Sequence, residues 1–167
     1  MAAIDGVVDG GLGIVTLAEP EGGNRLNPGS LAALLEVVGR FAADPAVRAV
    51  LLRSSGEAFC HGMDLAGLAG AEPATRAVAV RQAVAQYVQL LGLIHEAPKP
   101  VVALVAGSVK AGGVGLVSAC DVVIGSESCS FELGEALFGI IPANVLPYLL
   151  GDRKSTRLNS SHRIRSR

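Results

Sequence analysis

Runs of apolar residues alternate along this chain with polar and glycine-rich breaks. Residues 7–17 contain two apolar runs separated by an aspartate and two glycines, which predicts a β-hairpin. Residues 49–52 and 121–124 are short apolar runs, each typical of a buried strand. Because these runs alternate with helical patterns, they predict an α/β fold with a largely parallel sheet.

Two segments show the 3.6-residue apolar spacing of amphipathic helices. The first begins at Pro28, with Asn27 as its N-cap, and ends at Asp44. The second spans Thr75 to Glu96 and ends before Pro98. The positions expected to face the core are Leu31, Leu34, Leu35, Val38 and Phe41 in the first helix and Val78, Val84, Val88, Leu91 and Ile94 in the second.

The most informative stretch, residues 101–115, joins a strand to a glycine-rich turn. Val101 to Val105 predicts a buried strand, Gly107 breaks it, and residues 111–113 form a turn into a helical segment over residues 116–119. The first amides of a helix have no partner within it and carry about half an elementary charge. Glycines there let a substrate oxygen approach the backbone. The stretch therefore predicts a cradle for an oxyanion or a phosphate.

The composition favours a single domain with an aliphatic core. Half of the 167 residues are hydrophobic, only 4% are aromatic, and there is no Trp. No apolar run reaches roughly 18 residues, and the N-terminal segment carries Asp5 and Asp9 where a secretory signal would carry Lys or Arg. We therefore expect a soluble, cytoplasmic protein with no membrane partner. The three cysteines, Cys60, Cys120 and Cys129, form no CxxC pair, so we expect reduced, buried thiols and no metal site.

Charge is distributed unevenly along the chain. Residues 1–151 hold eight basic and 14 acidic side chains, whereas residues 152–167 hold six basic and one acidic. Such asymmetry can indicate an anionic partner, for example nucleic acid. The tail, however, has no apolar periodicity and follows the preceding segment without a cap or linker, as a translated vector sequence would. We expect a core over residues 1–151, a non-native basic tail over residues 152–167, and no nucleic-acid partner.

Several short motifs, in this order and spacing, resemble the crotonase (enoyl-CoA hydratase/isomerase) superfamily over roughly residues 4–150. They are Asn24-Arg25-Leu26-Asn27, Asp44-Pro45-Ala46-Val47-Arg48, Phe59-x-x-Gly62-Met63-Asp64, Gly107-x-x-x-Ala111-Gly112-Gly113, Asp121, Phe131-x-x-x-Glu135 and Gly139-x-x-Pro142. The resemblance implies a stacked ββα superhelix that binds an acyl thioester, carried on the phosphopantetheine of CoA or an acyl carrier protein, and stabilises its enolate without a further cofactor. Family members usually continue with more helices and form homotrimers, so we expect a fold that is incomplete at its C-terminus.

The resemblance also implies an oxyanion hole made by two backbone amides, those of Met63 and Gly112. In other oxyanion holes each such donor lowers the barrier by about 3 kcal/mol. The same motifs imply substrate-binding positions at Leu26, Gly62, Asp64 and Gly113.

The acid and base groups differ from those of hydratases, which usually carry two glutamates. The first glutamate's place, three residues after the second oxyanion glycine, is Gly115, whereas the second glutamate's place is retained as Glu135. A single carboxylate can move a proton at Cα or to a leaving hydroxyl if its pKa is raised towards neutrality. The apolar residues around Glu135 favour such a shift. From the residues alone, a solvated position on a helix is the favoured interpretation of Glu135, and the catalytic role comes from the resemblance.

A second proton-transfer group is not identified by the sequence. The candidates are His61, which has a near-neutral reference pKa, Asp64, which lies in the first oxyanion motif, and a residue from a missing C-terminal portion. The alternatives are a structural or surface role for His61 and a helix cap for Asp64. Lys110, beside the glycine turn, could steer a phosphate, or it could be an ordinary exposed loop residue.

Gly115, read with residues 62–64 and 135–147, resembles most the dehydratase of polyketide β-branching cassettes. That branch dehydrates a 3-hydroxy-3-methylglutaryl group on an acyl carrier protein. Its partner decarboxylase tends to carry a Lys in the helix after the first oxyanion loop, and here no Lys lies between Leu65 and Ala97. The alternatives are an acyl-CoA hydratase or isomerase of general metabolism and an inactive fragment that only holds the carrier arm.

Overall fold

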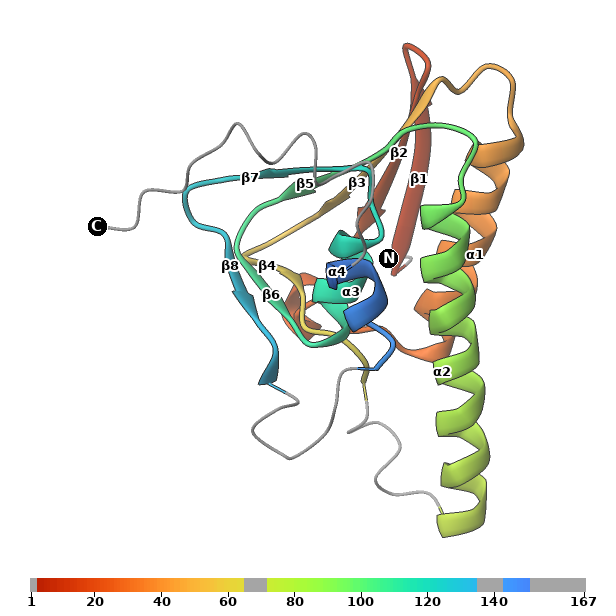
Figure 1. Cartoon of the computed structure of the whole chain (residues 1–167), viewed down its shortest axis with the longest axis vertical. Helices are drawn as coiled ribbons and strands as arrows, with labels where there is room; N and C mark the ends of the chain where they lie inside the picture. The colour runs from red at the N-terminus through yellow and green to blue at the C-terminus, as the bar shows by residue number, and fades with distance from the viewer. Residues whose placement is uncertain (1–2, 65–71, 135–142, 151–167) are drawn as a thin grey trace.

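The computed structural model describes residues 3–64, 72–134 and 143–150, which form two sheets and a set of helices (Figure 1). The first sheet has the strand order β1 (Ile4–Asp9), β2 (Leu12–Leu17), β3 (Ala49–Ser54), β5 (Val101–Val105) and β7 (Val122–Gly125). The second sheet consists of β4 (Ala58–Cys60), β6 (Ser108–Lys110) and β8 (Ser130–Glu132). Apart from the antiparallel β1–β2 pair, every described pairing between these strands is parallel, as the sequence predicts.

The helices differ greatly in length and in position. They are the 3₁₀ helix η1 (Pro20–Gly22), α1 (Pro28–Ala43), α2 (Pro73–His95), α3 (Gly112–Ser118) and α4 (Leu146–Leu150). The long helices α1 and α2 pack side by side along one side of the molecule (Figure 1). The short helix α3 lies against β4 and β6 of the second sheet and against α4.

A repeating unit explains this arrangement. A strand of the first sheet is followed by a strand of the second sheet and then by a helix, as in β3-β4-α2 and again in β5-β6-α3. The next pair, β7-β8, adds one more strand to each sheet. The expected stacking of ββα units is therefore present in the described residues. Because the strands of the second sheet are parallel, each of them ends at the same edge of that sheet.

The N-terminal elements follow the local sequence signals closely. The hairpin turns over two glycines, and both have positive φ angles, which glycine adopts without steric cost. In α1 the side chain of Asn27 accepts a hydrogen bond from Ser30 N, and the side chain of Ser30 accepts one from Asn27 N, which forms a capping box. The predicted N-cap and the helix end at Asp44 are confirmed.

The core is mostly aliphatic and draws its buried residues from both sheets and from α1, α2 and α3. Its largest fully buried side chains are Phe41, Phe59, Leu17, Leu26, Leu31, Leu34, Leu52, Leu90, Leu91, Ile94, Leu116 and Val15. The predicted apolar face of α1 is confirmed, since Leu31, Leu34, Val38 and Phe41 are buried and Leu35 packs partly against them.

One expectation needs correction, and three short strands were not predicted. In α2 the buried face runs through Ala83, Tyr87, Leu90, Leu91 and Ile94. Val78 and Val88 are 46% and 43% exposed, because both positions lie off that face of the helix. The segment around Phe59 contains a three-residue strand, β4, that the apolar pattern did not indicate. The strands β6 and β8 were not predicted, because each has only three residues and too few alternating positions to show a period.

Two of the cysteines behave as expected. Cys60 and Cys120 are buried free thiols, and burial raises the pKa of Cys60 to about 11 and that of Cys120 to about 12, whereas Cys129 is only partly buried.

By length and mean hydropathy alone α2 could cross a membrane, a criterion that core helices also satisfy. The segment 152–167 lies outside the described residues.

Candidate active site

The two glycine-rich motifs meet at the junction between the end of β4 and the start of α3. Gly62 has a φ of +79°, and a Cβ atom built on it would lie 2.7 Å from Gly112 N. The two motifs are 50 positions apart in the sequence, yet their backbones are in van der Waals contact. Any side chain at position 62 would separate them, so glycine is required there both by conformation and by space.

A second glycine makes this junction tighter. A Cβ atom on Gly113 would lie 2.3 Å from the backbone oxygen of Cys60, the last residue of β4. The first turn of α3 therefore packs directly on the β4 backbone. Close backbone contact between the end of β4 and the start of α3 therefore brings Gly62, Gly112 and Gly113 together. In the sequence, only the glycines mark this contact.

The amide of Met63 is directed away from its strand partner. Leu26 and Met63 form an isolated parallel bridge, in which Leu26 N donates to Gly62 O at 2.8 Å and Asp64 N donates to Leu26 O at 2.9 Å. These bonds use the groups on either side of Met63, so the Met63 N–H points to the opposite side of the strand. Leu26 is fully buried and Asp64 partly buried, and both hold residues 62–64 in place through their backbones.

The residue before α3 has an unusual backbone conformation. Ala111 has φ +49° and ψ −121°, a region that non-glycine residues seldom occupy. Its N–H donates to Glu132 O at 2.8 Å, at the end of β8, and its oxygen accepts from Val114 N. Strained residues of this kind cost about 1–3 kcal/mol and are found mainly at functional sites. The turn at Ala111 leads directly into α3, whose first residue, Gly112, has its N atom beside Gly62.

Position 115 lies on the same face of α3 as Gly112, and a buried tyrosine fills the space beside it. The Tyr87 hydroxyl donates to Gly112 O at 2.6 Å, and a Cβ atom on Gly115 would lie 2.1 Å from the same hydroxyl. Sequence analysis did not single out Tyr87. The available signal was a single tyrosine on the otherwise aliphatic buried face of α2, since a buried tyrosine usually needs a partner for its hydroxyl.

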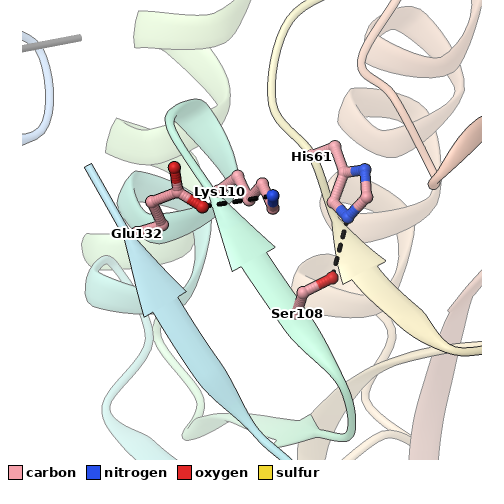
Figure 2. A network of polar contacts seen from close by, with 4 residues as sticks. All are labelled: His61, Ser108, Lys110 and Glu132. Carbon is pink, nitrogen blue, oxygen red and sulfur yellow. Dashed lines mark hydrogen bonds and ion pairs between the residues drawn. The ribbon is translucent and has the colours of Figure 1, made fainter. Parts of the chain in front are cut away.

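A row of polar residues crosses the second sheet next to this junction (Figure 2). His61 Nε2 and Ser108 Oγ are 2.8 Å apart, and Lys110 Nζ forms an ion pair with Glu132 at 3.1 Å. Both members of the ion pair are about half exposed, so it adds little stability. Lys110 is thus a strand residue paired with a carboxylate, rather than a loop lysine.

His61 lines an open cleft of about 510 Å³, together with Ser108 and the exposed Arg25. Partial burial, then the positive charges of Lys110 and Arg25, lower the pKa of His61, while Glu132 opposes them. The imidazole is therefore neutral at physiological pH. A neutral imidazole hydrogen-bonded to a serine hydroxyl can accept or relay a proton, and Arg25 gives the cleft an anion-binding group.

The predicted carboxylate, Glu135, lies outside the described residues. The described chain leads to it from the end of β8, where Glu132 O accepts the Ala111 amide beside the first turn of α3. Within the described ranges, no group of three or more His, Cys, Asp or Glu side chains could hold a metal ion.

Comparisons with known proteins agree with this geometry. The family model for enoyl-CoA hydratase/isomerase matches residues 8–158. The bacillaene synthase dehydratase PksH of Bacillus subtilis is 33% identical over 136 residues, which are 81% of this chain and 51% of that protein. The mitochondrial Δ(3,5)-Δ(2,4)-dienoyl-CoA isomerase of Rattus norvegicus is 31% identical over 151 residues, 83% of this chain and 46% of that protein.

Solved structures show the same architecture. Pseudomonas aeruginosa AtuE superposes with a TM-score of 0.82 at 32% identity, covering 95% of this chain and 61% of that structure. The chain spans about half the length of the curated relatives it matches. With the stacked ββα units, the touching glycine motifs and the family match over most of its length, the chain belongs to the enoyl-CoA hydratase/isomerase family, the crotonase superfamily.

Proposed function

We propose that this chain carries the oxyanion hole of an acyl-thioester lyase. In this proposal it dehydrates a 3-hydroxy-3-methylglutaryl thioester, held on an acyl carrier protein, during polyketide biosynthesis. A proton leaves Cα, the hydroxyl leaves Cβ and takes up a proton to become water, and a Cα–Cβ double bond forms. No cofactor besides the phosphopantetheine arm of the substrate takes part.

The contact between Gly62 and Gly112 is the observation that carries the proposal. Gly62 precedes Met63 in the chain, so the closeness of Gly62 to Gly112 N supports an oxyanion hole built from the N–H groups of Met63 and Gly112. When the Cα proton leaves, negative charge develops on the thioester oxygen, and two preorganised donors would stabilise that charge. In this proposal Leu26, Gly62, Asp64 and Gly113 shape the substrate site around these donors.

Glu135 is proposed as the proton-transfer group. It follows β8, whose last residue is held against Ala111, and one carboxylate can take the Cα proton or protonate the leaving hydroxyl. His61 is the candidate for the second group, because its neutral imidazole lines the adjacent cleft. The cleft, with Arg25 at its rim, suits the phosphate of the pantetheine arm on either carrier.

The dehydratase assignment has a more specific basis. Gly115 removes the first of the two carboxylates that hydratases use, and the described part of α2 contains no lysine. One of the similar proteins is named bacillaene synthase dehydratase, which supports a dehydratase. The similarity to an acyl-CoA isomerase favours the alternative, a hydratase or isomerase of general metabolism. A homotrimer, as the family resemblance implies, and a cytoplasmic location, as the composition predicts, complete the proposal.

The test compares Glu135→Gln with Glu127→Gln, an exposed glutamate in the turn before β8. Dehydration of the hydroxymethylglutaryl carrier thioester and hydration of crotonyl-CoA are both measured. We expect Glu135→Gln to lower dehydration by about 10²–10⁴-fold with nearly unchanged thioester binding, and Glu127→Gln to have no effect.

Each other outcome removes a defined part of the proposal. Turnover of Glu135→Gln within a few-fold of the unmodified chain excludes Glu135 from the mechanism. Equal activity on crotonyl-CoA and on the carrier thioester favours the general hydratase. Binding of the thioester without turnover of either substrate identifies a module that only holds the carrier arm.

A further inference from the structure

The Tyr87 side chain reaches from α2 to the first turn of α3. Tyr87 is only 4% exposed, and its hydroxyl donates a 2.6 Å hydrogen bond to the oxygen of Gly112. Its ring is also in contact with the backbone there, since a Cβ atom on Gly112 would lie 3.5 Å from both the ring carbon Cζ and the hydroxyl. The phenol therefore touches the same residue whose amide we assign to the oxyanion hole.

The same hydroxyl fills the space of a missing side chain. A Cβ atom on Gly115 would lie 2.1 Å from it and 2.9 Å from Val145 Cγ2. Positions 112 and 115 lie on one face of the helix, and helical side chains lean towards the N-terminus, which here is the oxyanion junction. A carboxylate at position 115 and a tyrosine at position 87 thus compete for one place beside the reacting atoms.

We propose that Tyr87 is a positioning and specificity-determining residue, which holds the oxyanion turn of α3 from the place where a carboxylate at position 115 would stand. The inference rests on the proposed function and deepens it. It explains why position 115 is glycine in this chain, because the Tyr87 hydroxyl occupies the space that a larger side chain at position 115 would need.

The physical reason lies in the freedom of the backbone at this turn. Gly112 and Gly113 are consecutive glycines, which have the widest range of backbone conformations. The hydrogen bond fixes the peptide plane between them, and so limits rotation about Gly112, whose own N–H belongs to the preceding peptide. This hydrogen bond keeps the Gly112 N–H oriented towards the thioester oxygen, and small errors in that orientation strongly reduce the rate of the chemical step.

The experiment combines single and double variants at positions 87 and 115. Tyr87→Phe removes only the hydroxyl, and Tyr148→Phe, which alters the other tyrosine of the chain at its contact with the His95 ring, is the matched control. We expect Tyr87→Phe to lower kcat roughly ten- to hundredfold with KM within about threefold, and Tyr148→Phe to leave kcat unchanged.

A spectroscopic measurement separates positioning from a purely structural role. The infrared stretch of a ¹³C-labelled carbonyl in bound butyryl-CoA moves to lower frequency when oxyanion donors polarise it. We expect Tyr87→Phe to reduce that shift at unchanged affinity for butyryl-CoA, whereas a variant that is merely destabilised would keep the shift in its folded fraction. An unchanged shift in Tyr87→Phe overturns the positioning role.

Two variants at position 115 test the specificity. Gly115→Glu should destabilise the protein when Tyr87 is present and should be better tolerated in the double variant Tyr87→Phe/Gly115→Glu, which should gain hydration of crotonyl-CoA. Equal tolerance of Gly115→Glu in both backgrounds overturns the competition for space. If the unmodified chain does not dehydrate the carrier thioester, the proposed function fails, but the stability difference and the infrared shift still decide whether Tyr87 positions this turn.

Discussion

At the scale of single residues, the site is defined more by absent side chains than by present ones. Gly62 and Gly113 have backbone atoms of the other motif where their Cβ atoms would stand, and Gly115 has a tyrosine hydroxyl there. Gly92 in α2 has nothing within 4 Å of that position. Glycines that look alike in the sequence therefore differ sharply in what they do, and substitution by alanine separates them.

The clearest case is Gly113→Ala. Because the new Cβ atom would lie 2.3 Å from the Cys60 oxygen, a backbone atom that cannot rotate away, β4 and α3 must move apart. We expect a loss in the free energy of unfolding of about 2 kcal/mol or more and a loss of thioester polarisation. Gly92→Ala should instead stabilise the protein by about 0.5–1 kcal/mol, through helix propensity. Urea denaturation measures both, and equal effects would contradict the tight β4–α3 junction.

At the scale of elements, the sequence predicted those whose signals are local. The hairpin, α1 with its cap, β3 and β5 have enough residues to show a period and clear glycine, proline or asparagine boundaries. The three-residue strands of the second sheet have no period, and only their partners in the sheet define them. The family motifs pointed to Gly62 and Gly112, whose backbones lie in contact in the structure, while the oxyanion role of the Met63 and Gly112 amides stays a prediction. The Tyr87 contact joins residues 25 positions apart and required the structure.

The hydrogen bond between His61, which follows β4, and Ser108 of β6 leads to a prediction about the pH dependence of stability. His61, which bonds to Ser108 of β6, has a lowered pKa because partial burial and the charges of Lys110 and Arg25 disfavour its protonated form. In the pH range between that lowered pKa and about 6.5, the unfolded chain binds more protons than the folded one. The free energy of unfolding should therefore rise with pH through this range and lose this dependence above it.

Two variants isolate the contribution of His61 to that pH dependence. His61→Gln should remove the part of the slope that lies below about pH 6.5. Lys110→Gln removes one of the two cations that lower the His61 pKa, so the pH range over which stability rises should become narrower. Glu132 then also loses its ion-pair partner. Urea unfolding at a series of pH values gives the slopes, and a slope unchanged in His61→Gln would assign it to other groups.

At the scale of the whole molecule, the acidic core and the basic tail raise separate questions. The core over residues 1–151 has the stacked ββα units and the paired glycine motifs of the family. The family match extends to residue 158, into the segment that we expect to be non-native on the basis of its composition. The origin of residues 152–158 can therefore be tested separately from that of the remaining basic residues.

Truncations after Gly151 and after Leu158 test the tail. If the tail is foreign to the fold, both truncations should leave the midpoint of thermal unfolding unchanged, because the segment buries no apolar surface of the core. Neither the full chain nor the truncated forms should bind duplex DNA with the steep salt dependence that several phosphate contacts produce. A lower midpoint in the form that ends at Gly151, but not in the form that ends at Leu158, would show that residues 152–158 belong to the fold. Salt-dependent binding that disappears with residues 159–167 would instead establish an anionic partner for those residues, because released counterions are the signature of phosphate neutralisation.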